Sequence, residues 1–115
     1  MRFVVHAKDK TDALTRRMAA LEGHRAYLDK APAAFGVQVL LSGPLIEDEG
    51  TGMIGSFFLL EAPDRESVLA LFNKDPLKRA DVWETFVVDA VIIRQDNLSG
   101  PRVSTLPNDD SNIAG

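Results

Sequence analysis

The stretch GVQVLLSGPLIEDEGTGMIGSFFLLE, residues 36–61, decides the fold because it holds two apolar runs joined by an acidic, glycine-rich connection. Residues 36–42 are rich in β-branched and aliphatic side chains, so they predict a strand that Gly43-Pro44 stops. A second strand is predicted over about residues 53–61. Residues 47–52 between them are typical of a solvated loop. We therefore expect a hairpin at the centre of the chain.

The segment before this hairpin predicts a strand followed by a helix. Residues 2–8 begin with a near-continuous apolar run, which indicates a strand covered on both faces. Thr11 or Asp12 then offers a side-chain oxygen to cap a helix that runs to about residue 30. Pro32 ends this helix, because its ring disfavours a helical conformation in the residue before it. Apolar residues recur along the helix at helical spacing: Leu14, Met18, Leu21 and Leu28.

The segment after the hairpin predicts a second helix and a last strand. Asp64 is a suitable N-cap for the helix, and Asp75-Pro76 restarts the chain in a short helical turn. A long apolar strand is expected over about residues 83–94. Residues 97–115 are rich in proline, glycine, asparagine, aspartate and serine, so we expect an extension with little regular structure.

The predicted order β-α-β-β-α-β is that of a ferredoxin-like α+β fold. In this fold a four-stranded antiparallel sheet carries both helices on one face, and here it occupies a single domain over residues 1–96. The apolar residues on the other face would leave a large exposed patch on a monomer. We therefore expect a homodimer formed sheet against sheet.

Composition excludes several classes of function. Lysine and arginine total 13 and aspartate and glutamate total 17, a net charge of −4 with no basic cluster, so nucleic-acid binding is not expected. The chain has no cysteine, which excludes disulfides, thiol nucleophiles and thiolate metal sites. Apolar stretches such as Phe57–Leu60 are too short to span a bilayer, and the N-terminal residues lack the pattern of a secretory signal. We therefore expect a cytoplasmic protein that does not enter a membrane.

Metal and cofactor sites are not expected either. His6 has no partner at the spacing of a histidine metal motif. The acidic run Glu47-Asp48-Glu49 is typical of a solvated loop, and Gly50-Thr51-Gly52 lacks the strand-to-helix context of a phosphate-binding loop.

His24 is the most informative single residue. It follows Leu21 by three positions and precedes Leu28 by four, so it shares the inward side of the first helix. There it is either a hydrogen-bonded core residue or a base that projects into a cavity. Asp75 is the candidate carboxylate partner, although an aspartate before a proline is also an ordinary helix cap. The same carboxylate can serve both purposes.

Two groups of small residues are weaker candidates. Ser42-Gly43-Pro44 either terminates a strand or places a hydroxyl beside a ligand. Gly55 and Ser56 lie in an otherwise bulky strand, where small side chains indicate close approach by another group or only make room for packing.

A family resemblance connects these positions. It is carried, in order, by His24, Tyr27-Leu28, Leu41-Ser42-Gly43-Pro44-Leu45, Gly55-Ser56, Asp75-Pro76-Leu77 and Trp83-Glu84. Their order and spacing resemble the YciI-like (YCII-related) family over about residues 2–94. The resemblance implies a dimeric ferredoxin-like fold similar to muconolactone isomerase. It also implies a catalytic His–Asp pair at His24 and Asp75, and a pocket lined by Ser42, Gly43 and Pro44. Some relatives resemble a dehydrochlorinase of chlorinated hydroxyhydroquinones.

Three functions follow from these observations. The first is a cofactor-independent lyase or isomerase in which His24 is the general base, Asp75 orients its ring, and Ser42 with nearby groups holds an oxygen of a small cyclic or aromatic substrate. The second is a dimer that binds an unknown small molecule without turning it over. The third is an interaction domain that acts through its sheet face and its C-terminal extension.

Overall fold

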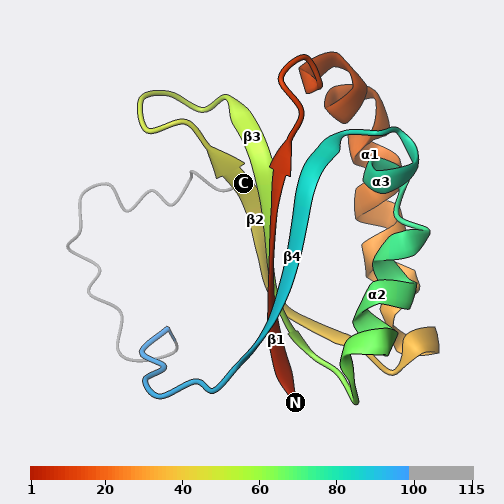
Figure 1. Ribbon diagram of the computed structural model, residues 1–115, viewed down its shortest axis with the longest axis vertical. Helices are drawn as coiled ribbons and strands as arrows, with labels where there is room; N and C mark the ends of the chain where they lie inside the picture. The colour runs from red at the N-terminus through yellow and green to blue at the C-terminus, as the bar shows by residue number, and fades with distance from the viewer. Residues whose placement is uncertain (99–115) are drawn as a thin grey trace.

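The computed structural model describes residues 1–98, which form a four-stranded antiparallel sheet with the helices packed on one face (Figure 1). The elements are β1 (Arg2–Asp9), α1 (Leu14–Lys30), the 3₁₀ helix η1 (Pro32–Phe35), β2 (Gln38–Ile46), β3 (Met53–Glu61), α2 (Arg65–Asn73), α3 (Pro76–Arg79) and β4 (Trp83–Val91). The strand order is β2-β3-β1-β4, so the ferredoxin-like α+β fold predicted from the sequence is confirmed. Residues 99–115, most of the predicted extension, lie outside the described part of the chain.

β1 lies at the centre of the sheet and shows how the core is built. Its residues alternate between the two faces, and Val5 on the helix side is paired with Phe58 of β3 and Val88 of β4. All three side chains are buried beneath the helices. His6, the next residue, points to the opposite face and is exposed. None of the described helices is long and apolar enough to cross a membrane.

The buried face of α1 differs from the predicted one. Leu14 and Met18 are 52% and 53% exposed, whereas Arg17 is buried together with His24, which was expected on the inward side. A charged residue can take an inward position when its hydrogen bonds are satisfied, and Arg17 has two partners below the helix. Apolar spacing was therefore wrong for the first half of the helix, at Leu14 and Met18, while Leu21, His24 and Leu28 lie on the inward side as expected.

The start of α1 also departs from the prediction. The helix is preceded by Ala13 and has no side-chain cap, so neither Thr11 nor Asp12 satisfies its first amides. Its end is as expected, because the helix stops at Lys30 and Pro32 opens the following 3₁₀ turn.

β2 continues through the residues that were expected to stop it. Gly43 and Pro44 pair with Phe57 and Ser56 of β3, and the strand ends only at Ile46. Proline is compatible with a strand here because β2 is at the edge of the sheet, where one side of its backbone needs no partner. β4 is shorter than predicted and ends at Val91.

Candidate functional site

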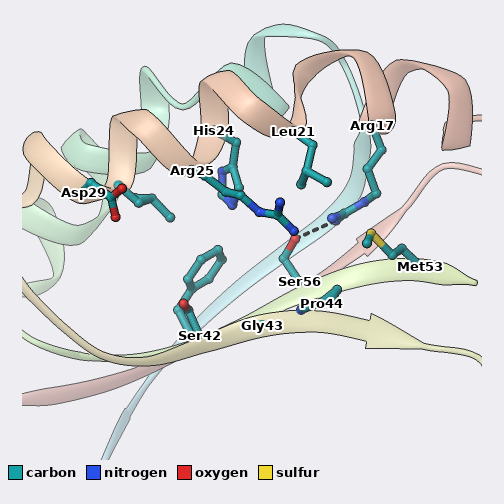
Figure 2. Close-up of a pocket in the computed structure, with 12 residues that line it drawn as sticks. Arg17, Leu21, His24, Arg25, Asp29, Ser42, Gly43, Pro44, Met53 and Ser56 are labelled. Carbon is teal, nitrogen blue, oxygen red and sulfur yellow. Dashed lines mark hydrogen bonds between the residues drawn. The ribbon is translucent and has the colours of Figure 1, made fainter. Parts of the chain in front are cut away.

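A cavity of about 140 Å³ lies between α1 and the β2–β3 hairpin (Figure 2). Its lining comes from three elements: Arg17, Leu21, His24, Arg25, Leu28 and Asp29 of α1; Ser42, Gly43 and Pro44 of β2; and Met53, Ser56 and Phe58 at the ends and middle of β3. Five of the six predicted site residues are in this set. Asp75 is not, because it lies behind His24.

His24 and Asp75 are hydrogen-bonded. The His24 Nδ1 atom is 2.8 Å from Asp75 Oδ1 and 2.9 Å from Asp75 Oδ2, within the normal hydrogen-bond range. Asp75 is fully buried, while the His24 side chain keeps 10% exposure. The pair therefore extends from the protein interior to the wall of the cavity.

The start of α3 holds the Asp75 carboxylate in place. Asp75 is the N-cap of this short helix, with Pro76 at its first position, and its Oδ1 accepts a hydrogen bond of 2.8 Å from the Leu77 amide. The sequence indicated that one carboxylate can serve as a cap and as a partner of His24, and Asp75 makes both contacts. The bond from the Leu77 amide therefore helps to hold the carboxylate in the orientation that meets His24.

The carboxylate also selects the state of the neutral imidazole ring. A carboxylate accepts hydrogen bonds, so Nδ1 carries the hydrogen and Nε2 keeps a free lone pair. Phe58 and Trp83 present T-shaped contacts to the ring, with centroids 6.0 and 6.5 Å away. Among residues 1–98, nothing bonds to Nε2, and no fully buried side-chain nitrogen or oxygen lacks a partner. Nε2 is therefore an acceptor open to the cavity.

Tyr27 ties α1 to the neighbouring helix one turn after His24. Its hydroxyl donates a hydrogen bond of 2.6 Å to the Leu71 carbonyl. Burial, and after it the negative charge of Asp75, raise the pKa of Tyr27, while Arg79 opposes the shift. The tyrosine therefore stays neutral and keeps its hydrogen bond across the neutral pH range.

A second buried cluster at the other end of the cavity was not predicted. The Arg17 guanidinium bonds both carboxylate oxygens of Asp9, at 2.7 and 3.1 Å, and donates to Ser56 Oγ at 2.6 Å. Trp83 Nε1 donates to the same Ser56 oxygen at 3.2 Å. Arg17 precedes His24 by seven residues, which is two helical turns, so the spacing that pointed to His24 also contained the signal for Arg17.

The small residues of β2 and β3 have separate explanations. A Cβ on Gly55 would lie 2.3 Å from the Ala7 carbonyl oxygen and 2.7 Å from a methyl of Leu45, so strand packing requires glycine there. A Cβ on Gly43 would meet nothing within 4 Å, so packing does not require glycine there, although Gly43 lines the cavity. Ser56 is 2% exposed and forms the floor of the cavity, whereas Ser42 is exposed at its edge.

The cavity mouth carries charges that the sequence reasoning also missed. Arg25 and Asp29 of α1 are exposed and line it. Figure 2 shows Asp29 toward one end of the cavity and Arg17 toward the other, with Ser56 between them and bonded to Arg17. Residues 1–98 contain no group of three or more histidine, aspartate or glutamate side chains placed to hold a metal ion.

The sequence of residues 1–91 matches the YCII-related domain. The chain belongs to this family. Among solved structures, its fold is similar to that of 5-chloro-2-hydroxyhydroquinone dehydrochlorinase from Burkholderia phenoliruptrix, in complex with 2,5-dihydroxybenzoquinone. That match has 24% identity and a TM-score of 0.74, and covers 82% of this chain and 96% of the other.

More distant structures share the fold of this YCII-related protein. The C-terminal domain of the MgtC protein from Mycobacterium tuberculosis has 14% identity and a TM-score of 0.51, with 82% of this chain and 90% of that one covered. A dimeric ferredoxin-like protein of unknown function from Bacteroides fragilis has 11% identity and a TM-score of 0.50, with 80% and 94% covered. No curated protein matches the chain in sequence.

Proposed function

We propose that this YCII-related protein is a cofactor-independent lyase or isomerase that acts on a small cyclic or aromatic substrate. His24 is the general base. Asp75 holds the ring in the required tautomer and stabilises the imidazolium that forms when the ring accepts a proton. Ser42, Gly43, Pro44 and Ser56 form the walls that position the substrate.

One observation carries the proposal: the Asp75 carboxylate occupies Nδ1 with both oxygens, so the free lone pair of His24 is on the cavity side. A histidine that served only packing would have both nitrogens satisfied inside the protein. Here one nitrogen is fixed and the other is available to a ligand, as general-base catalysis requires.

The size of the cavity fits the proposed substrate class. An apolar cavity of about 150 Å³ accommodates benzene, and the volume here is about 140 Å³. One substituted six-membered ring therefore fills it. The dehydrochlorinase of similar fold acts on such a ring and binds another, which supports the same class for this protein.

The chemistry is balanced without an added reagent. His24 Nε2 takes a proton from the substrate, and the electron pair left behind either expels a leaving group such as chloride or moves a double bond along the ring. In the first case the net loss is HCl. In the second the imidazolium returns the proton to another atom of the ring, so the substrate only rearranges. No electron leaves the substrate, so no redox partner is needed.

Chloride release from 5-chloro-2-hydroxyhydroquinone tests the proposal. We expect turnover by the wild-type protein and a loss of at least about 10²-fold in His24→Gln. His6→Gln is the matched control, because His6 is the other histidine and lies on the opposite face of the sheet. A folded His24→Gln protein that keeps wild-type turnover would rule out His24 as the base.

We also propose that the protein is a homodimer formed through the face of the sheet that the helices leave open. Leu41 and Val87 are 40% and 47% exposed on strands of this sheet, and Phe57 and Leu59 are partly exposed. An apolar face of this kind is typical of an interface. Light scattering should give twice the chain mass of 12.6 kDa, and a species of only that mass at micromolar concentration would contradict the dimer.

A further inference from the structure

The Ser56 hydroxyl has an incomplete set of hydrogen bonds. Its oxygen accepts one bond from Arg17 Nη2 and one from Trp83 Nε1, and both of these groups can only donate. A serine hydroxyl has two lone pairs and one hydrogen. Both lone pairs are therefore occupied, and only the hydrogen remains to be placed.

Nothing in the described part of the chain accepts that hydrogen. Ser56 donates no hydrogen bond to any group within residues 1–98, although the residue is only 2% exposed. Ser56 lines the cavity, and its two donors approach from Arg17 at the α1 side and from Trp83 at the start of β4. Because Ser56 lines the cavity and no described group accepts its hydrogen, a ligand in the cavity can supply the missing acceptor.

The two donors also make this hydroxyl unusually suited to an anion. Arg17 carries a positive charge, and hydrogen bonds in a buried chain strengthen one another by polarisation. Electron density withdrawn from Ser56 Oγ makes the O–H a stronger donor and the oxygen a poor base or nucleophile. Ser56 therefore stabilises negative charge on a ligand oxygen rather than attacking the ligand.

The charges around the cavity agree with this polarity. Asp9 neutralises Arg17 from behind, whereas Arg25 lines the cavity and forms no ion pair within residues 1–98. The acidic residue in the lining, Asp29, lies toward the opposite end of the cavity from Arg17, which bonds Ser56 (Figure 2). The side of the cavity where Arg17 bonds Ser56 is thus the side that favours a negative oxygen.

We propose that Ser56, polarised by Arg17 and Trp83, is the donor of an oxyanion subsite for a ring compound that carries an ionised oxygen, a phenolate or an enolate. This rests on the proposed function for the direction of the substrate, because the proton-bearing atom then faces His24. Binding at the subsite does not require turnover, so the two proposals can fail separately.

Trp83 provides a direct reporter, because it is the protein's one tryptophan and its indole N–H bonds Ser56. The probe is 2,5-dihydroxybenzoquinone, whose oxygens are ionised at neutral pH. The matched probe is 2,5-dimethylbenzoquinone, which has the same ring and no ionisable group. We expect the indole N–H resonance to shift on addition of the first probe, and the first probe to bind at least about tenfold more tightly than the second.

Variants of Ser56 test whether its hydroxyl causes the tighter binding of the ionised probe. Ser56→Ala should reduce the affinity for the ionised probe about tenfold or more and leave the affinity for the neutral probe within about threefold. Ser56→Cys keeps nearly the same shape with a much weaker donor, and should give the same loss if Ser56→Ala does not fold. Equal affinity of the wild-type protein for the two probes, or an unchanged preference in a folded Ser56 variant, would overturn the subsite.

His24→Gln separates this proposal from the proposed catalysis. With the subsite intact, the variant still prefers the ionised probe over the neutral one even when chloride release is lost. If the wild-type protein releases chloride and Ser56→Ala loses both this activity and the probe preference, the subsite is part of substrate binding. Wild-type chloride release by His24→Gln would instead remove only the general-base assignment.

Discussion

Helix α1 buries two polar side chains two turns apart, each against a carboxylate, and the two pairs differ in one respect. Arg17 donates its side-chain hydrogen bonds to Asp9 and Ser56 inside the protein, and its side chain is 2% exposed. His24 gives one nitrogen to Asp75 and leaves the other toward the cavity, and its side chain is 10% exposed. Both pairs are therefore buried beside a carboxylate. They differ because His24 keeps one nitrogen, Nε2, that bonds to no group within residues 1–98.

The largest expected effect is on stability and comes from the Arg17 pair. Asp9→Ala leaves the guanidinium buried without its carboxylate, which should lower the free energy of unfolding by about 3–5 kcal/mol. Urea unfolding measures this, with Asp12→Ala as the control at an exposed aspartate of the same segment. A loss of less than about 1 kcal/mol for Asp9→Ala would show that Arg17 finds water or another partner.

A change in the His24–Asp75 pair should lower turnover more than it lowers stability. Asp75→Asn keeps an N-cap side chain for α3, because asparagine caps helices as well as aspartate does. The amide cannot hold the ring in the same way, so turnover should fall by about 10²–10⁴-fold while the unfolding free energy changes by only about 1 kcal/mol. Comparable kcat in wild type and Asp75→Asn would contradict the orienting role.

A smaller effect, on ligand affinity, is expected from a change at Trp83, which contacts both His24 and Ser56. Trp83 contacts the His24 ring and donates to Ser56. Trp83→Phe keeps the aromatic contact and removes only this donor, so affinity for the ionised quinone should fall by a few-fold, less than in Ser56→Ala. Calorimetric titration measures this difference. A loss as large as that of Ser56→Ala would mean that the indole, and not the charged Arg17, controls the hydroxyl.

The smallest expected effect concerns the pH dependence of stability and involves Tyr27, beside the candidate catalytic pair. The pKa of Tyr27 is raised in the folded protein by burial and by Asp75, so the unfolded chain ionises first as the pH rises through about 10. The stability that Tyr27 contributes is fully present below this pH and is lost as the pH rises through the folded pKa. Tyr27→Phe should therefore lose less stability than wild type between neutral and strongly alkaline pH.

Phenolate absorbance follows this titration without interference between tyrosines, because Tyr27 is the protein's one tyrosine. A folded-state midpoint at or below the ordinary value near 10 would contradict the raised pKa.

The sequence predicted those parts of the structure that depend on local chemistry. β3 has the predicted bounds, and Asp64 and Asp75 cap helices as expected. The errors arose where tertiary contacts override local preference. Pro44 lies within a strand because β2 is an edge.

The inward stripe of α1 was misplaced in its first half for the same reason. Arg17 can be buried only because it bonds Asp9 and Ser56 below the helix. Asp9 ends β1 and Ser56 lies in β3, so these contacts form only in the folded protein. Hydrophobic periodicity records apolar residues and cannot register a charged one with matched partners. The sequence predicted His24 because an imidazole between leucines interrupts the apolar pattern. Arg17 follows Arg16, and two adjacent arginines are typical of a solvated helix face.

The protonation of the His24 ring tests the central claim most directly. Nitrogen NMR of the side chains resolves two histidines, and His6 on the open sheet face serves as the internal reference. At a pH where the ring is neutral, the account predicts hydrogen on Nδ1, no hydrogen on Nε2, and a shift of the Nε2 resonance when a ring ligand enters the cavity. Hydrogen on Nε2 in the neutral ring, or an Nε2 resonance that does not respond to a bound ligand, would contradict it.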